Sequence, residues 1–197
     1  MVFKHLVTSL IALLIFTVIT GVLYPLLVTG IAQVAFPGKA NGSLMTRGGK
    51  TVGSELIGQP FTDPKYFWSR PSPTSPYPYN AAASTGSNLG PTNPALLDEV
   101  RGRLADLKKT DSTNVLPVPV DLVTSSSSGL DPDISVAGAQ YQVPRVARAR
   151  GLREESVRAL VEGLTRGRSF GILGEPRVNV LQLNLALDEG SARSGGN

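Results

Sequence analysis

The feature that most limits how this chain can fold is a long apolar stretch near its N-terminus. Between His5 and Lys39 there is no Asp, Glu, Lys or Arg, and 18 of the residues from Leu6 to Phe36 are Leu, Ile, Val or Phe. A helix needs about 20 apolar residues to cross the hydrocarbon core of a bilayer. Exposing these side chains to water would cost on the order of 27–54 kcal/mol, which the rest of the chain could not offset. We therefore predict a transmembrane helix and membrane exit at residues 6–36, after a short N-terminus at residues 1–5.

The alternative for this stretch is a cleaved secretory signal, with Gly30-Ile31-Ala32 as a small-residue cleavage site. The apolar core of a signal peptide is about 7–15 residues long, half the length of this stretch, so a retained anchor is favoured. Charge does not decide the orientation. Lys4 precedes the stretch, three basic residues follow it, and large C-terminal domains are often translocated regardless of such charges.

Small and polar residues recur every four positions within the apolar stretch, at Thr17, Gly21, Pro25 and Thr29. This spacing places them on one face of a helix. Membrane helices pack closely through such faces, so we predict that these four residues contact partner helices, although small residues are common in any membrane helix. Pro25 crowds the carbonyl of Gly21, which predicts a distortion of the helix at this point.

Several chemistries are excluded by counting residues. The chain has no cysteine and one histidine, His5. A disulfide framework, a cysteine zinc site and a Ser-His-Asp triad are therefore impossible. A net charge of +4 with 6% aromatic residues lacks the basic, aromatic-interleaved surface of nucleic-acid-binding proteins, so we expect no nucleic acid partner.

The remaining residues predict a single α+β domain of mixed short strands and helices at residues 53–189, joined to the membrane helix by a linker at residues 37–52. Residues 53–94 lack a helical period but contain aromatic side chains, so we expect ordered loops and short strands there. Residue spacing then predicts helices at 95–109, 135–142, 144–151 and 154–164, strands at 116–124 and 178–187, and a flexible tail at 190–197.

The chemical motifs are weak. Gly49-Lys50-Thr51 resembles the end of a phosphate-binding loop, but Leu44 occupies the position that requires a glycine. The serines at 125–128 have no histidine as a base, so a nucleophile there would depend on a nearby lysine. Asp131 and Asp133 are expected to cap the next helix, and a calcium site is less favoured because further oxygen ligands are missing. Seven arginines between residues 145 and 168 are expected to form mainly a solvated helix face.

Six short motifs follow one another between residues 53 and 181. They are GSELIGQ at 53–59, YFWSRPS at 66–72, PYN at 78–80, STGSNLG at 84–90, SGLDP at 128–132 and RVNVL at 177–181. Through these motifs the chain resembles the C subunit family of Kdp-type potassium-transporting P-type ATPases, from the apolar stretch to about residue 188. The resemblance directs attention to loop residues that either organise the fold or meet a partner: Tyr66, Trp68, Arg70, Tyr79, Asn80, Ser87, Asn88, Asp131 and Asn179.

The resemblance implies an accessory subunit that has no catalytic or metal-binding residues. Its partners would be a channel-like potassium-translocating subunit, an ATP-hydrolysing subunit and the lipid bilayer of the cell (inner) membrane. The N-terminus would be cytoplasmic and the domain extracytoplasmic. ATP, magnesium and potassium would act on the complex, with no cofactor bound by this chain. The family is described as a catalytic chaperone that raises the ATP affinity of the ATP-hydrolysing subunit. A domain across the membrane from ATP could do this only through a coupling free energy.

Two other classes of function remain open on the residues alone. One is a membrane-anchored extracytoplasmic hydrolase that uses a serine and a lysine. The other is an anion- or nucleotide-binding module built on the arginine-rich helices.

Overall fold

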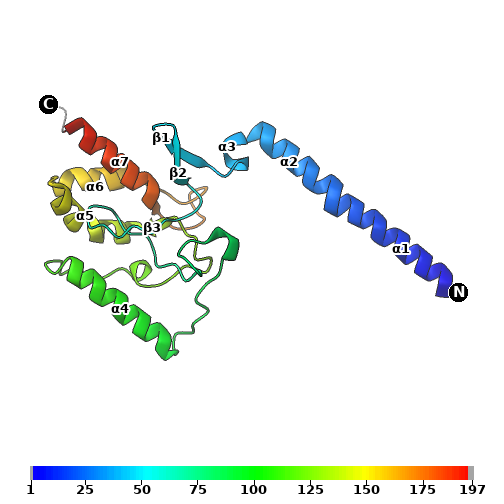
Figure 1. Cartoon of the computed structure of the whole chain (residues 1–197), viewed down its shortest axis with the longest axis horizontal. Coiled ribbons are helices and arrows are strands. Elements are labelled where there is room, and N and C mark those ends of the chain that lie inside the picture. The colour runs from blue at the N-terminus through cyan, green and yellow to red at the C-terminus, as the bar shows by residue number, and fades with distance from the viewer. Residues whose placement is uncertain (1, 195–197) are drawn as a thin grey trace. The chain divides into compact units, whose positions relative to one another are not determined.

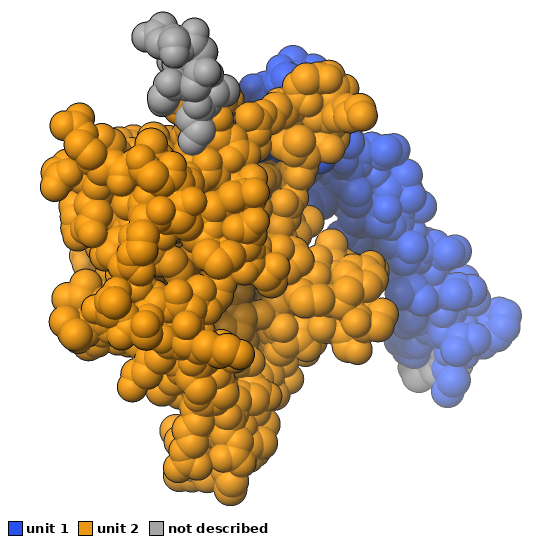
Figure 2. Space-filling model, turned by 60° about the vertical axis from the view of Figure 1, so that its left-hand side comes forward, with its two compact units in different colours: residues 1–45 blue, residues 46–197 orange. Residues whose placement is uncertain are grey.

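The computed structural model describes the backbone of residues 2–194. The chain divides into two compact units, residues 1–45 and residues 46–197 (Figure 2). Unit 1 is helical: α1 (Val2–Val18) continues through the π-helical turn η1 (Ile19–Leu23) into α2 (Tyr24–Ala35), and the short α3 (Pro37–Ala40) follows (Figure 1). Unit 2 contains helices and short strands together, which agrees with the expected α+β class.

The continuous helix Val2–Ala35 has the length and composition needed to cross a membrane. It comprises 34 residues, and none of its most apolar window is buried within the chain. At about 1.5 Å per residue it is about 51 Å long, against a hydrocarbon core of about 30 Å. This helix coincides with the predicted transmembrane segment at residues 6–36.

The distortion expected at Pro25 is present as the π-helical turn η1. Proline has no backbone N–H, so Pro25 cannot donate to the carbonyl of Gly21. The N–H of Tyr24 instead reaches back five residues to the carbonyl of Ile19. One widened turn thereby accommodates the proline, and the helix continues on either side of it.

The boundary between the two units lies within β1 (Leu44–Arg47), which forms a two-stranded sheet with β2 (Lys50–Ser54) of unit 2. Residues 37–52, expected as a linker, therefore contain α3 and most of this hairpin. A second sheet has the antiparallel order β3-β5-β4, from β3 (Asp133–Ser135), β5 (Arg177–Asn179) and β4 (Thr165–Arg166). Ile134 lies opposite Val178 in this sheet, and both side chains are buried.

Three helices and this sheet enclose the core of unit 2. They are α5 (Val136–Arg150), α6 (Glu154–Gly163) and α7 (Val180–Ser194). α6 packs against both α5 and α7. Six valines of these helices and of β5 are at most 1% exposed: Val143, Val146, Val157, Val161, Val178 and Val180. The fourth helix of the unit, α4 (Pro94–Thr110), buries only Leu107 and lies along the edge of the domain (Figure 1). The helices predicted at 95–109 and 154–164 are confirmed by α4 and α6.

The strand predicted at 178–187 is wrong beyond Asn179. The side-chain oxygen of Asn179 accepts a hydrogen bond from the N–H of Gln182, which caps the start of α7. Val180, Leu183 and Leu187 then lie at helical spacing and are buried. The leucines alternate along the sequence, but the cap and the helical spacing of the buried side chains decide the conformation. Helix α7 also includes residues 190–194 of the predicted tail, and residues 195–197 lie outside the described part of the chain.

Two further predictions are corrected. Residues 116–124 contain the 3-10 turn η3 (Val120–Leu122) in place of a strand, because Pro117 and Pro119 cannot donate to a strand ladder. The two helices predicted on either side of Pro144 are one helix, α5. Burial of its apolar face outweighs the cost of about 3 kcal/mol for an interior proline. This helix ends as expected at Gly151, whose φ of +63° is left-handed.

Candidate functional site

The segment Tyr66–Trp68 is held in place by two buried side-chain amides. Asn184 of α7 accepts a hydrogen bond from the N–H of Phe67 (2.8 Å) and donates to its carbonyl (3.0 Å). Gln142 of α5 does the same for Trp68, at 2.7 and 3.1 Å. Both amides are at most 2% exposed, and Phe67 is fully buried. The two amides thus satisfy backbone groups that a neighbouring strand would satisfy in a sheet.

Arg145 completes this anchor and is not part of a solvated face. Its side chain donates to the carbonyl of Tyr66 (3.0 Å), to that of Pro64 (2.5 Å) and to Gln142 (2.6 Å). The guanidinium also lies 4.4 Å from the centre of the Trp68 ring, a cation–π contact. Arg145 is 4% exposed, and burial lowers its pKa to about 10. The prediction of solvated arginines is wrong here because the segment offers carbonyl acceptors to a buried cation.

A second cluster surrounds Asp188 of α7. Its carboxylate accepts hydrogen bonds from Arg150 (2.7 Å), Arg47 (2.9 Å) and the hydroxyl of Tyr66 (3.2 Å). Arg150 also lies over the Tyr66 ring, 4.9 Å from its centre. Burial alone would raise the pKa of Asp188, but the hydrogen bonds from Arg150 and Arg47 outweigh it and hold this pKa below its usual value. The cluster therefore ties β1, the aromatic segment and α7 to one another.

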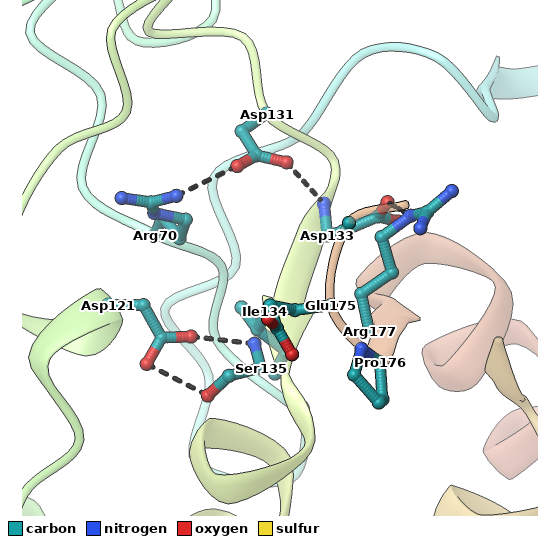
Figure 3. A pocket seen from close by; sticks show the side chains of 10 residues that line it. Arg70, Asp121, Asp131, Asp133, Ile134, Ser135, Glu175, Pro176 and Arg177 are labelled. Atoms are coloured by element: carbon teal, nitrogen blue, oxygen red, sulfur yellow. Dashed lines mark hydrogen bonds and ion pairs between the residues drawn. The ribbon is translucent and has the colours of Figure 1, made fainter. Parts of the chain in front are cut away.

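Arg70 and Asp131 form the centre of a third cluster (Figure 3). The guanidinium of Arg70 donates to one oxygen of Asp131 (2.9 Å), and the other oxygen accepts the N–H of Asp133 (3.0 Å). The predicted helix cap at Asp131 and Asp133 is wrong. Ser135 caps α5 through the N–H of Gly138, because its own N–H and hydroxyl are held by Asp121.

An open pocket of about 320 Å³ lies beside this cluster. Its walls come from the Arg70 loop, Asp121 of η3, β3 and the loop before β5, and Figure 3 shows side chains of both charges around it. Burial raises the pKa of Asp133, against a hydrogen bond from Asn179 and the positive charge of Arg177. Because both arginines and carboxylates line the pocket, these side chains are expected to form ion pairs with one another and not a binding site that carries charge of a single sign.

Tyr79 connects its own motif, PYN at 78–80, to the motif YFWSRPS at 66–72. Its hydroxyl donates to the carbonyl of Arg70, and its N–H donates to the hydroxyl of Ser72 (2.9 Å). Burial raises the pKa of Tyr79 to about 12. The ring lies directly against Gly58, where an added Cβ would come within 2.3 Å of a ring carbon. Gly58 is therefore required by the close approach of Tyr79.

The other motif residues hold loops as well. The amide of Asn80 caps η2 (Ala81–Ala83) through the N–H of Ala82. The amide of Asn179 donates to the carbonyl of Glu55 (2.9 Å) and to Asp133 (3.2 Å). Ser87 accepts from the N–H of Leu89, and Asn88 has a left-handed backbone with φ +54°. Ser87 and Asn88 thus shape a local turn.

The four residues of the membrane-helix stripe are exposed on unit 1, and an added Cβ at Gly21 would meet no atom within 4 Å. Sequence reasoning did not single out the anchoring residues of unit 2: Gln142, Asn184 and Asp188. Asn184 had a detectable signal, since it shares a helical face with Val180, Leu183 and Leu187. A polar residue among buried apolar ones indicates a structural hydrogen bond.

These contacts define the class of protein: an α+β domain whose polar loop residues hold one another, preceded by a helix long enough to cross a membrane. Among the residues described, no group of three or more His, Cys, Asp or Glu side chains could hold a metal ion. The hydroxyls of Ser126 and Ser128 accept hydrogen bonds from loop N–H groups.

The chain belongs to the KdpC family. The family model described as K+-transporting ATPase, c chain, matches residues 6–189. Three similar proteins carry the name Potassium-transporting ATPase KdpC subunit. That of Herpetosiphon aurantiacus is 63% identical, over 92% of this chain and 94% of its own length. That of Methylococcus capsulatus is 60% identical (94% and 97%), and that of Methylibium petroleiphilum is 62% identical (91% and 94%).

Proposed function

We propose that this chain is an accessory, non-catalytic subunit of an ATP-driven potassium uptake complex. In this role it stabilises the assembly and raises the ATP affinity of the ATP-hydrolysing subunit. The observation that carries the proposal is the family match, which extends over residues 6–189 and so includes both the apolar helix and the α+β domain. The sequence has no Asp-Lys-Thr-Gly motif, so the aspartyl phosphate of a P-type ATPase would form on another chain.

The helix Val2–Ala35 would anchor the subunit, with its N-terminus in the cytoplasm and unit 2 outside. Its stripe of Thr17, Gly21, Pro25 and Thr29 would face the channel-like and ATP-hydrolysing subunits. Two observations support this. Gly21 leaves room for a close approach of another helix, and it lies within η1. π-helical turns occur often at functional sites.

If unit 2 lies outside the membrane, it cannot contact cytoplasmic ATP. It can then change the ATP affinity of the ATP-hydrolysing subunit only through a coupling free energy transmitted by the membrane subunits. If unit 2 stabilises one conformation of the membrane subunits, and that conformation binds ATP more tightly, then ATP affinity rises. The geometry supports such a rigid body. The aromatic segment is joined to α5 and α7 through Gln142, Arg145 and Asn184, and Asp188 joins α7 to Arg150 of α5 and to Arg47 of β1.

The two other classes of function fit the contacts less well. A hydrolase would use a serine of 125–128, whose Ser126 and Ser128 hydroxyls already accept loop hydrogen bonds. An anion- or nucleotide-binding module would use the arginines of α5. Arg145 is held by backbone carbonyls, and Arg148 is paired with Asp111 at 3.1 Å.

Co-purification of the complex tests the anchoring stripe. We expect Gly21→Leu to weaken recovery of the transporter subunits, because the larger side chain prevents close helix contact. Gly30→Leu is a matched control: Gly30 also has no atom near an added Cβ, and it lies about 180° around the helix from Gly21. Equal recovery with both variants would refute the stripe.

Nucleotide measurements test the coupling. The complex assembled with this chain should have a lower KM for ATP than the complex without it, whereas calorimetry of the chain alone with ATP should show no binding. Heat of binding to the chain alone would instead favour the nucleotide-binding module.

The cysteine-free chain also permits a topology test, since Ser127→Cys should react with a membrane-impermeant thiol reagent in intact cells.

A further inference from the structure

The loop between β4 and β5 carries an exposed apolar tip, defined as residues 169–173. Phe170 is 93% exposed, Ile172 75% and Leu173 57%. Single exposed apolar residues are ordinary on a protein surface, whereas a contiguous group marks an interaction site. We propose that this tip inserts into the interfacial region of the lipid bilayer and gives unit 2 a second membrane contact. This inference rests on the proposed anchoring by the helix Val2–Ala35.

The backbone of the tip carries a conformational cost. Phe170 has a left-handed φ of +54° and is followed by Gly171 with a φ of +77°. Bulky side chains rarely adopt the left-handed region. The turn therefore presents its largest apolar side chain outward at a conformational cost, a combination that indicates a contact outside the chain.

The tip suits an apolar environment in two respects. Residues 169–174 carry no charged side chain. The turn also closes its own backbone hydrogen bonds, since the N–H of Ser169 donates to the carbonyl of Leu173 (2.8 Å) and the N–H of Leu173 donates back to Ser169 (2.9 Å). Insertion would therefore place three apolar side chains in lipid while these backbone groups remain paired.

Ion pairs at the base of the loop place a polar boundary behind the tip. Arg168 pairs with Glu175 at 2.7 Å, and Arg166 pairs with Glu55. These four charges balance, so apolar burial and not attraction to anionic lipid would drive insertion. Vesicles of phosphatidylcholine alone should therefore suffice.

The location of the tip favours lipid over a distant partner. Glu55 directly follows β2, so its ion pair with Arg166 places the base of the loop at the end of the hairpin by which the chain enters unit 2. Figure 1 shows the loop beside β2. Only residues 36–43 separate α2 from β1, and a segment of this length spans at most about 30 Å. The chain thus enters unit 2, beside the base of the loop, only a short segment after the proposed membrane anchor.

Depth-dependent fluorescence quenching tests the inference on the full chain in phosphatidylcholine vesicles. The chain has no cysteine, so Phe170→Cys carries one environment-sensitive fluorophore. Val115→Cys is the matched control, since Val115 is 94% exposed and follows α4 on another part of unit 2. We expect brominated lipid to quench the label at 170 and aqueous iodide to quench the label at 115.

A second variant measures the contribution of the side chains. With the label at Leu173→Cys, replacing Phe170 by Asp should lower the ratio of lipid-exposed to water-exposed tip by about tenfold or more. The same measurement with Val115→Asp should leave the ratio unchanged.

Three results would overturn the inference: iodide access at 170 equal to that at 115, lipid quenching equal at both positions, or protection of 170 from both quenchers only when the other subunits are present. The last would assign the tip to a protein surface. Flotation of the chain with the vesicles is scored separately. A chain that fails to float refutes the proposed anchoring, whereas a floating chain with a water-exposed tip refutes only the insertion.

Discussion

Replacing Asn184 by Leu tests whether the buried amide holds the aromatic segment. The amide satisfies the N–H and the carbonyl of Phe67, at 2.8 and 3.0 Å. Asn184 is 2% exposed and Phe67 is fully buried, so water cannot replace the lost partner without opening the core.

The expected magnitude follows from two opposing contributions. Each buried backbone group left without a partner costs about 1–3 kcal/mol, so the two together cost about 2–6 kcal/mol. Burying a leucine side chain contributes about 1.5–3 kcal/mol in the opposite direction. Taking the middle of each range, we expect the free energy of unfolding to fall by about 2 kcal/mol.

Urea unfolding of the detergent-solubilised chain, followed by the fluorescence of Trp68, measures this change. Trp68 is the chain's one tryptophan and neighbours Phe67. Glu189→Leu, at an exposed position of the same helix, is the control and should change stability by no more than about 0.5 kcal/mol. The sign is decisive: if Asn184→Leu is as stable as the parent or more stable, the amide does not anchor the segment.

Three other predictions concern single residues. The pKa of Asp188 is lowered in the folded state, so its carboxylate contributes stability above its unfolded pKa of about 4. This contribution is lost as the pH falls through the folded pKa. Asp188→Asn should therefore make the free energy of unfolding depend less steeply on pH at the acid end, and an unchanged slope would contradict the assignment. Burial raises the pKa of Tyr79 to about 12, so an absorbance titration should show one of the five tyrosines titrating last. The stabilising neutral form of Tyr79 should be lost only as the pH rises through about 12. Tyr79→Phe should remove this late step. Gly58→Ala should destabilise unit 2 by about 1–3 kcal/mol in urea unfolding, because the new methyl group meets the Tyr79 ring and the carbonyl of Asp131, whereas Gly90→Ala, with no atom within 4 Å, should be nearly neutral.

Local patterns predicted those elements whose cause is local. The membrane-length helix follows from an unbroken apolar composition, and α4 and α6 follow from apolar residues at helical spacing together with the cap at Asn93 and the acidic first turn of α6. The distortion near Pro25 follows from one missing N–H. Each of these depends on residues a few positions apart.

The errors arose where distant residues decide the conformation. Residues 178–187 alternate like a strand, yet α7 forms because its face of Val180, Leu183 and Leu187 is buried in the core. Residue Pro144 could begin a helix, yet it lies within α5 because the buried face continues on both sides of it. Burial contributes more than a local preference in both cases, and a sequence without its fold does not show what is buried.

The sequence alone determined that this chain has a membrane-length helix, lacks cysteine and histidine chemistry in its domain, and carries ordered motifs of one family. Only the tertiary structure decided what those motif residues do. Arg70 meets Asp131 across 61 positions, and Asn184 meets Phe67 across 117. The physical reason is that a buried polar group must find its hydrogen-bond partner in space, and nothing in the order of the residues specifies which distant partner that will be.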